Sequence, residues 1–208
     1  MLAYIPMRAE SRKRNWQVMG EHLVDIVYRA AVTARVELRI VTSDTFRPVE
    51  LQTDDSPIID TVRWLHNMFP KEEHMVLLQP TSPFVTPSHI DDCCNGVEFG
   101  RWKSAQTVTE VPHVDHWMNQ RHYNPRGGSI QLTHAKDRDL LRTNNKQEKP
   151  ETWRFGNCVA FDIRAAIDQN TCFPGPSKGI PVHPKYCIDV DTELDLEIAN
   201  LMKKGMAL

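Results

Sequence analysis

Residues 75–83 read Met-Val-Leu-Leu-Gln-Pro-Thr-Ser-Pro, an apolar run followed at once by a polar turn that contains two prolines. A short continuous apolar run is typical of a strand that is buried on both faces of a parallel sheet. Pro80 and Pro83 lack the backbone N–H that a strand ladder needs, so the strand is expected to end at Leu78. This stretch therefore predicts an α/β fold with a mainly parallel sheet.

Strand-like and helical patterns alternate on both sides of this segment, which extends the prediction to a three-layer α/β domain. Apolar residues at 23, 26, 27, 30, 31 and 34 form the stripe of an amphipathic helix. We expect further helices at 57–68 and from Pro87 or Ser88 onward, and strands or other regular structure at 2–5, 38–42, 158–163 and 186–190.

The last helix has the clearest terminal signals. Thr192 is placed to cap its start, and Asp195 three residues later completes a pattern close to a capping box. Gly205 is placed to end the helix. Its buried stripe is predicted to consist of Leu194, Ile198, Leu201 and Met202.

Residues 111–150 differ from the rest of the chain because they are polar and rich in His, Asn and Arg. A structureless loop of this length would be unusual inside a compact domain. We therefore expect an extended arm, formed of β-hairpins, that packs on another subunit or over the site. The whole chain, 1–208, is predicted to be one domain with this arm inserted.

Composition excludes several classes of protein. The net charge of −2 gives no extended basic footprint for nucleic acid, and no apolar run approaches the ~20 residues of a membrane helix. The first residues do not resemble a signal peptide. The five cysteines form no CxxC pair, so we expect reduced thiols in a cytoplasmic protein. The spacing of His113 and His116, with His122 and His134 downstream, would allow a metal site, but the histidines are expected to be scattered surface or packing residues.

The pair Asp189 and Asp191 is the sharpest chemical feature of the sequence. If residues 187–191 are extended, both carboxylates lie on one face and repel each other unless a cation lies between them. Mg²⁺ fits this pair, because it prefers oxygen ligands and often binds through one or two carboxylates plus substrate phosphates. In the alternative interpretation Asp189 is solvated and Asp191 caps the following helix.

Two polar segments follow predicted strands at the edge where ligands of open α/β sheets bind. Arg8-Ala9-Glu10-Ser11-Arg12-Lys13-Arg14-Asn15 carries four cations that could neutralise a triphosphate, although it could also be a solvated turn. Gln79 leaves the buried strand and is well placed to hydrogen-bond a ligand. The polar turn could equally serve only to end the strand, without contacting a ligand.

In order and spacing, these segments resemble the acylneuraminate cytidylyltransferase family, the CMP-sialic acid synthetases and their bacterial relatives. The resemblance runs from residue 2 to about 202. It is carried by Ile5-Pro6-Met7-Arg8 with Ser11, Gly20-Glu21-His22-Leu23-Val24, Ile40-Val41-Thr42-Ser43-Asp44, Arg47-Pro48-Val49-Glu50-Leu51, Leu77-Leu78-Gln79-Pro80-Thr81-Ser82-Pro83, Lys146-Gln147-Glu148-Lys149-Pro150 with Arg154 and Asn157, and Ile188-Asp189-Val190-Asp191-Thr192-Glu193-Leu194-Asp195.

The resemblance implies a Rossmann-like nucleotidyltransferase fold, a homodimer whose arm crosses to the partner, and roles for individual residues. Asp189 and Asp191 would hold Mg²⁺ and would be catalytic together with Arg8 and Arg14. The nucleotide would be bound by Arg8, Ser11, Arg14, Asn15, Arg47 and Ser56. The sugar pocket would be lined by Gln79, Lys146, Asn157 and Phe161.

The implied reaction couples an acidic, sialic-acid-like sugar to CMP from CTP. The anomeric hydroxyl attacks the α-phosphorus and pyrophosphate leaves, with catalysis by positioning and charge stabilisation; Asp189 could instead act as a base through water. Departures from the family pattern leave alternatives open, since the basic loop is shorter, Cys158 replaces glycine and Phe161 replaces tyrosine. The alternatives are a nucleotidyltransferase for a different sugar and a non-catalytic nucleotide-binding relative.

Overall fold

The computed structural model describes residues 1–7, 12–42, 47–53, 55–99, 101–134, 136 and 149–206. It divides into two compact units. The first unit comprises Met1–Val108 and Phe155–Leu208, and the second comprises Thr109–Arg154, which includes the segment predicted as an arm. No helix among the described residues is long and apolar enough to cross a membrane.

The first unit is built on a six-stranded sheet with the order β10-β6-β9-β5-β1-β4. Its strands are β1 (Leu2–Ile5), β4 (Arg39–Thr42), β5 (His74–Leu78), β6 (Ser104–Glu110), β9 (Trp153–Asp162) and β10 (Ser177–Pro181). β1 pairs in parallel with both β4 and β5, and β10 pairs in parallel with β6, whereas β5 and β9 are antiparallel. The predicted, mainly parallel sheet is confirmed.

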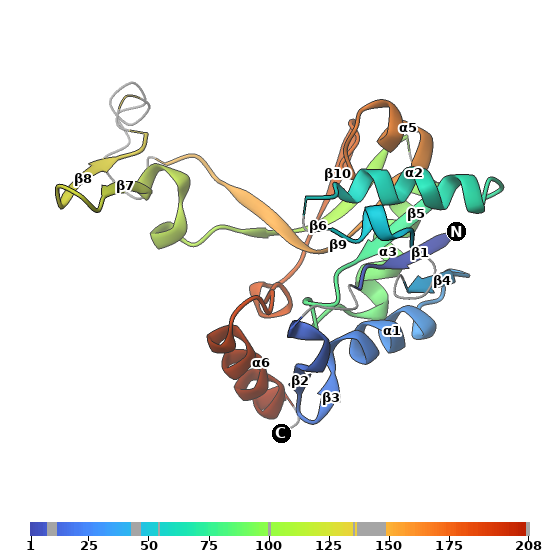
Figure 1. The fold of residues 1–208 in the computed structure, drawn as a ribbon, viewed down its shortest axis with the longest axis horizontal. Helices are drawn as coiled ribbons and strands as arrows, with labels where there is room; N and C mark the ends of the chain where they lie inside the picture. The colour runs from blue at the N-terminus through green and yellow to red at the C-terminus, as the bar shows by residue number, and fades with distance from the viewer. Residues whose placement is uncertain are drawn as a thin grey trace. The chain divides into compact units, whose positions relative to one another are not determined.

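Helices cover both faces of this sheet (Figure 1). The helices α1 (Leu23–Thr33) and α3 (Pro87–Glu98) pack on one face, and α2 (Ile58–Met68) and α5 (Ile163–Asp168) pack on the other. Successive residues of β1 serve the two layers in turn: Ala3 and Ile5 face α1 and α3, whereas Leu2 and Tyr4 face α2. The three-layer α/β architecture is therefore confirmed.

Local signals place most of the helices correctly. In α1 the predicted stripe is buried from Leu23 to Ala31, and Ala34 is partly buried just beyond it. The helix α3 begins at Pro87, because the Thr86 side chain accepts a hydrogen bond from the His89 amide, 3.3 Å away, and caps the first turn. Shorter elements of the first unit are η1 (Arg12–Asn15), β2 (Gln17–Val18), β3 (Glu21–His22), η2 (Val49–Leu51) and η6 (Pro184–Tyr186).

Residues 186–190 do not form the predicted strand. η6 covers Pro184–Tyr186, and residues 187–191 belong to no strand ladder, although the Val190 amide donates to the Thr81 carbonyl over 2.8 Å. The reason is that β5, which precedes Thr81, is already flanked by β1 and β9 and has no open edge. The segment instead crosses the turn after β5.

The helix α6 (Glu193–Met206) has the predicted cap but not the predicted buried stripe. The Thr192 amide donates to Asp195 Oδ2 over 2.8 Å, and the Asp195 amide donates to Thr192 Oγ1 over 3.2 Å. Met202 is the one residue of the predicted stripe that packs inward, and the others, Leu194, Ile198 and Leu201, are exposed. The inward face is completed by Leu196 and Ala199, which were not predicted. The helix also continues past Gly205. Both apolar sets have helical spacing, so periodicity alone could not choose between them.

The second unit contains the predicted hairpin, formed by β7 (Arg121–Asn124) and β8 (Ser129–Leu132). Gly128 in its turn has φ +64°, a conformation that suits glycine. Two short helices, η3 (His113–Asp115) and η4 (Trp117–Asn119), precede the hairpin. A backbone hydrogen bond joins the beginning of the unit to its end: the Val111 amide donates to the Thr152 carbonyl over 2.8 Å.

Candidate functional site

The carboxyl ends of β1 and β5 lie side by side at a change of direction in the sheet. From β1 the chain returns through α1 to β4 on one side, and from β5 it passes through α3 to β6 on the other side. Such a switch point leaves a crevice where ligands of open α/β sheets bind. Three segments reach this edge: η1 after β1, the turn 79–83 after β5, and residues 187–191.

Lys13 and Asp191 join the basic and acidic segments at this edge. The Lys13 ammonium forms an ion pair with Asp191 Oδ1, across 178 positions of sequence. In Figure 1, α6, which follows Asp191, lies beside β2, which follows η1, and the contacts between the two elements agree. The acidic pair therefore already attracts a cation from the loop after β1.

Asp189 is held in a polar and electrostatically unfavourable position. Partial desolvation and the neighbouring Asp191 raise the pKa of the Asp189 carboxyl above its usual range, while a hydrogen bond from Thr81 and the Lys13 charge partly offset this rise. A divalent cation bound between the Asp189 and Asp191 carboxylates would relieve their mutual repulsion. Hard oxygen donors of this kind fit Mg²⁺, which completes its coordination with waters and phosphates.

No group of three or more His, Cys, Asp or Glu side chains suited to a metal occurs in the part of the chain that the structure describes. A metal held by Asp189 and Asp191 would therefore depend on the substrate for further ligands, as Mg²⁺ commonly does.

An apolar cluster supports the three converging segments. Val18 and Phe84 follow η1 and the turn after β5, and they are buried together with Val190. Trp16, Tyr186 and Ile188 pack against the same cluster. Since one packed cluster fixes the flanks of all three segments, their polar residues are held in a defined arrangement.

Arg47 and Ser56 lie in the connection that follows β4. Arg47 is only 7% exposed, and its Nε and Nη2 atoms have no hydrogen-bond partner among the described residues. A buried guanidinium of this kind suits an anionic or carbonyl-bearing ligand. The Ser56 hydroxyl is engaged within the loop, where it donates to the Glu50 carbonyl over 2.9 Å.

Of the predicted sugar-binding residues that the structure describes, Gln79 and Asn157 lie at the carboxyl edge of the sheet, whereas Phe161 does not. Gln79 is half-buried at the carboxyl end of β5, in the predicted position. Phe161 is fully buried among the residues that face α2, because β9 runs antiparallel to β5 and places Phe161 opposite Met75, toward the amino end of the strand. We therefore leave Phe161 out of the candidate pocket. Asn157 is also fully buried and is hydrogen-bonded to protein groups.

Several predicted residues lie outside the described part of the chain. Arg8, Ser11 and Lys146 are among them, as is the side chain of Arg14, so their roles stay predictions. Asn15 is described and is exposed at the end of η1. Sequence reasoning did not single out Lys13 or Thr81, although both lie within the two segments that it selected. What could have identified them is their position directly after a predicted strand, not their residue type.

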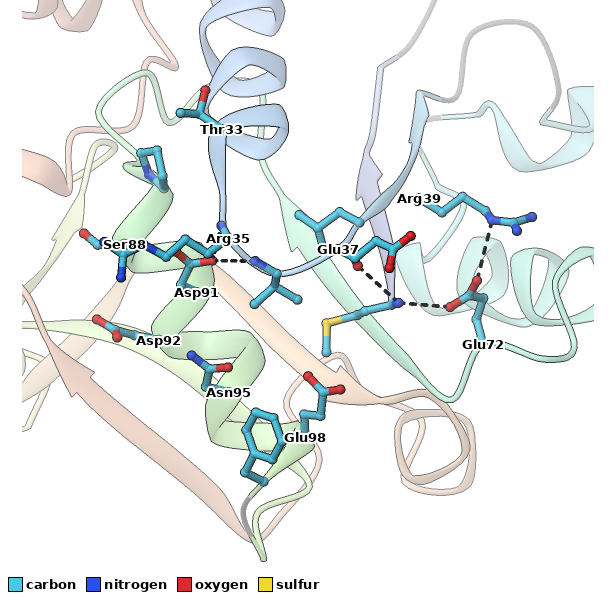
Figure 2. A pocket seen from close by; sticks show the side chains of 15 residues that line it. Thr33, Arg35, Glu37, Arg39, Glu72, Ser88, Asp91, Asp92, Asn95 and Glu98 are labelled. Carbon is cyan, nitrogen blue, oxygen red and sulfur yellow. Dashed lines mark hydrogen bonds and ion pairs between the residues drawn. The ribbon is translucent and has the colours of Figure 1, made fainter.

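A cavity of about 1050 Å³ lies at the opposite edge of the sheet, near the start of β1 (Figure 2). Several of its charged groups have partners within the protein. Glu72 pairs with the Met1 ammonium at 3.2 Å and with Arg39 at 3.5 Å, and Asp91 accepts the Arg35 amide at 2.8 Å. We place the candidate site at the carboxyl edge, because the segments after β1 and β5 meet the two aspartates and Lys13 there.

No protein-family model matches the chain. Among solved structures, it is similar to a CMP:2-keto-3-deoxy-manno-octonic acid synthetase complexed with CTP, with 16% identity, a TM-score of 0.63 and coverage of 98% of both chains. It is also similar to 4-diphosphocytidyl-2C-methyl-D-erythritol synthase from Anaerococcus prevotii DSM 20548, with 13% identity, a TM-score of 0.61 and coverage of 98% of this chain and 95% of the other. At these identities the likeness establishes the fold.

Proposed function

We propose that this protein is a Mg²⁺-dependent cytidylyltransferase that couples an acidic sugar to CMP from CTP and releases pyrophosphate. The observation that carries the proposal is the ion pair between Lys13 and Asp191, which unites the basic and acidic segments at the switch point of the sheet. It is supported by the two similar folds, whose names both describe synthesis of a cytidyl product. The reduced cytoplasm is the compartment we propose, since five buried thiols suit it.

In the proposed reaction the anomeric oxygen of the sugar forms a bond to the α-phosphorus, and the bond from that phosphorus to the bridging oxygen breaks. The hydroxyl proton passes to water, or to Asp189 through water, and pyrophosphate carries away the electron pair. Lys13 would neutralise phosphate charge, while Asp189 and Asp191 would hold Mg²⁺. The metal would supply charge neutralisation and alignment of the phosphates. The protein's contribution is therefore positioning and electrostatics.

For the substrate we propose a 2-keto-3-deoxy sugar acid. The sialic-acid-like substrates implied by the sequence belong to this class, and so does the octonic acid named for the first similar structure. Since Phe161 lies in the core and the Asn157 side chain is bonded to protein groups, we propose that Gln79 contacts the sugar.

The deciding experiment measures pyrophosphate release with CTP and Mg²⁺ over a panel of eight- and nine-carbon keto-deoxy sugar acids, neutral hexoses and pentoses. ATP, GTP and UTP replace CTP in parallel reactions. Release that requires both CTP and one acid establishes the activity and identifies the substrate. CTP binding without release from any sugar would instead favour a non-catalytic nucleotide-binding protein.

Replacing Lys13 with Met is expected to lower kcat/KM for CTP by about 10²-fold, because one cation facing the phosphates is lost. Lys13→Arg keeps the charge and should retain more activity. The control is Lys71→Met, which removes an exposed lysine from the turn after α2. Steady-state pyrophosphate assays measure the effect, and an unchanged kcat/KM in Lys13→Met would remove Lys13 from the site.

We also propose that the chain is a homodimer and that the hairpin of the second unit contributes to the interface. Tyr123 and Ile130 lie directly opposite each other on β7 and β8 and are 58% and 62% exposed. Such an apolar cross-strand pair is costly to leave in water.

The double variant Tyr123→Ser/Ile130→Ser is expected to sediment as a monomer at concentrations where the wild type is dimeric. The matched control is His122→Ser/Gln131→Ser, an adjacent pair on the other face of the same hairpin. Sedimentation velocity measures both, and a monomeric wild type would contradict the proposal.

A further inference from the structure

A buried polar network lies at the carboxyl edge of the sheet, next to residues 187–191, which carry Asp189 and Asp191 and are called the aspartate segment below. Its centre is Asn157 on β9, which has no exposed surface. Asn157 Oδ1 accepts a hydrogen bond from Thr107 Oγ1 on β6 over 3.0 Å. Asn157 Nδ2 lies 3.1 Å from His89 Nδ1 on α3 and donates to the Tyr186 carbonyl over 3.0 Å. One amide therefore joins two strands, a helix and the segment that leads to Asp189.

The Asn157 amide has no donor left for a ligand. A side-chain amide offers two N–H donors, and these are directed at His89 and at the Tyr186 carbonyl. His89 Nδ1 accepts in this arrangement, since the Thr86 amide also points at it from 3.4 Å. Burial lowers the pKa of His89, against a smaller opposing effect of Asp92, and so favours the neutral ring that can accept. The network is complete without a bound sugar.

The network holds the aspartate segment at one end, and the turn after β5 holds it at the other. Asn157 fixes the carbonyl of Tyr186, whose ring also packs edge-on against His89 at 5.1 Å between centroids. Four residues later the Val190 amide donates to the Thr81 carbonyl over 2.8 Å. Asp189 lies between these two anchors and Asp191 directly follows the second. No strand ladder runs along this segment. These contacts, the packing of Ile188 and Val190 in the apolar cluster, and the ion pair of Asp191 with Lys13 define its path.

Gly156 permits the close approach on which the network depends. A Cβ atom at this position would lie 2.6 Å from Thr107 Oγ1 and 3.0 Å from the Thr107 backbone carbon. The Thr107 hydroxyl also accepts the backbone amide of Asn157 over 2.8 Å. A side chain at 156 would therefore separate Thr107 from Asn157.

We propose that Asn157, oriented by Thr107 and His89, is a positioning residue that holds Asp189 and Asp191 in place through the carbonyl of Tyr186. The inference rests on the proposed function in so far as the two aspartates hold a metal. It differs from the sugar contact that the family resemblance implied for Asn157, because the side chain acts on the protein's own backbone. Supporting groups of this kind typically change metal affinity by about 10–100-fold when they are removed.

The first test measures hydrogen exchange of the peptide that contains Val190 and requires no activity. In Asn157→Ala the Val190 amide is expected to exchange about tenfold faster or more, since one of the two anchors is lost. The matched control is Ser104→Ala, which removes another fully buried hydrogen bond, from Ser104 Oγ to the Pro174 carbonyl, at the other end of β6. Unchanged exchange at Val190 in a folded Asn157→Ala protein would overturn the proposal.

Thr107→Val is the second variant if Asn157→Ala does not fold. It keeps the side-chain volume and removes the hydroxyl, which orients the Asn157 side chain and also accepts the backbone amides of Asn157 and Cys158. Faster exchange at Val190 in this variant, with Thr107→Ser close to the wild type, supports the network. Equal exchange in all three proteins would overturn it.

The second test measures binding of Mn²⁺, as a probe for Mg²⁺, by electron paramagnetic resonance in the presence of CTP. The affinity of Asn157→Ala for Mn²⁺ is expected to be at least about tenfold lower than that of the wild type. The affinity of Ser104→Ala should equal that of the wild type. If the Val190 exchange rate rises but the wild type binds no Mn²⁺, the positioning role stands and the metal-dependent function fails. If Mn²⁺ affinity falls without a change in exchange, the positioning role is overturned and the proposed function stands.

Discussion

Asp189→Asn is expected to lower the rate of CTP-dependent pyrophosphate release by about 10²–10³-fold. The substitution keeps the size of the side chain and removes the negative charge that would attract a divalent cation at the switch point of the sheet. Asp191 alone would keep its ion pair with Lys13 and leave no second carboxylate for the metal. Initial rates at saturating CTP measure the loss, and Asp191→Asn should produce a loss of similar size.

The matched control for this prediction is Glu197→Gln, which removes one exposed negative charge from the nearby helix α6. Its rate should equal that of the wild type. A fully active Asp189→Asn enzyme would exclude a metal at this position and would shift the candidate site elsewhere.

Asp189→Asn should also unfold at the same temperature as the wild type or a higher one, which separates loss of function from loss of fold. Because desolvation and Asp191 raise the pKa of Asp189, the folded protein binds a proton there more readily than the unfolded chain does. The stability associated with this group is therefore full below the unfolded pKa of 3.8 and is lost as the pH rises through the folded pKa. The advantage of the asparagine variant should disappear in acid.

Phe161→Ala is expected to reduce the free energy of unfolding by about 3–5 kcal/mol, because it leaves a cavity beneath α2. The Phe161 ring has no exposed surface and packs among Leu2, Tyr4 and Val62. Urea denaturation followed by circular dichroism measures the change. Phe161→Leu, which keeps most of the volume, should cost less than about 1.5 kcal/mol.

The same two variants decide between the core position and the sugar contact that the family resemblance implied for Phe161. A sugar contact would leave the unfolding midpoint nearly unchanged and raise the KM for the acid. That result would return Phe161 to the pocket and would contradict its place in the core.

Sequence reasoning reached the parts of the fold that depend on near neighbours along the chain. The apolar run 75–78 is a buried strand of the sheet, and the prolines end it where expected. The stripe in α1 is buried from Leu23 to Ala31. The Thr192–Asp195 cap forms because donor and acceptor lie three residues apart, within reach of each other in any helix that begins there.

Predictions that depended on a partner element were less successful. In α6 two apolar sets, one with Ile198 and one with Ala199, have helical spacing, and only packing against Val18 and Leu23 selects the second. Residues 186–190 have the composition of a strand but reach a position where β5 has no free edge. In both cases the local pattern is present in the sequence, but the element packed against it determines which residues are buried or whether a strand forms.

The candidate site shows the same division. By itself the sequence determined the kinds of group involved, namely a cation-rich loop after the first strand, a polar turn after a buried strand, and two aspartates before the last helix. Only the tertiary structure brought Lys13 to Asp191 across 178 positions, committed Asn157 to the Tyr186 carbonyl, and placed Phe161 in the core. The physical reason is that strand order and direction decide which side chains meet, and that a buried polar group must bond to whichever partner the fold brings to it.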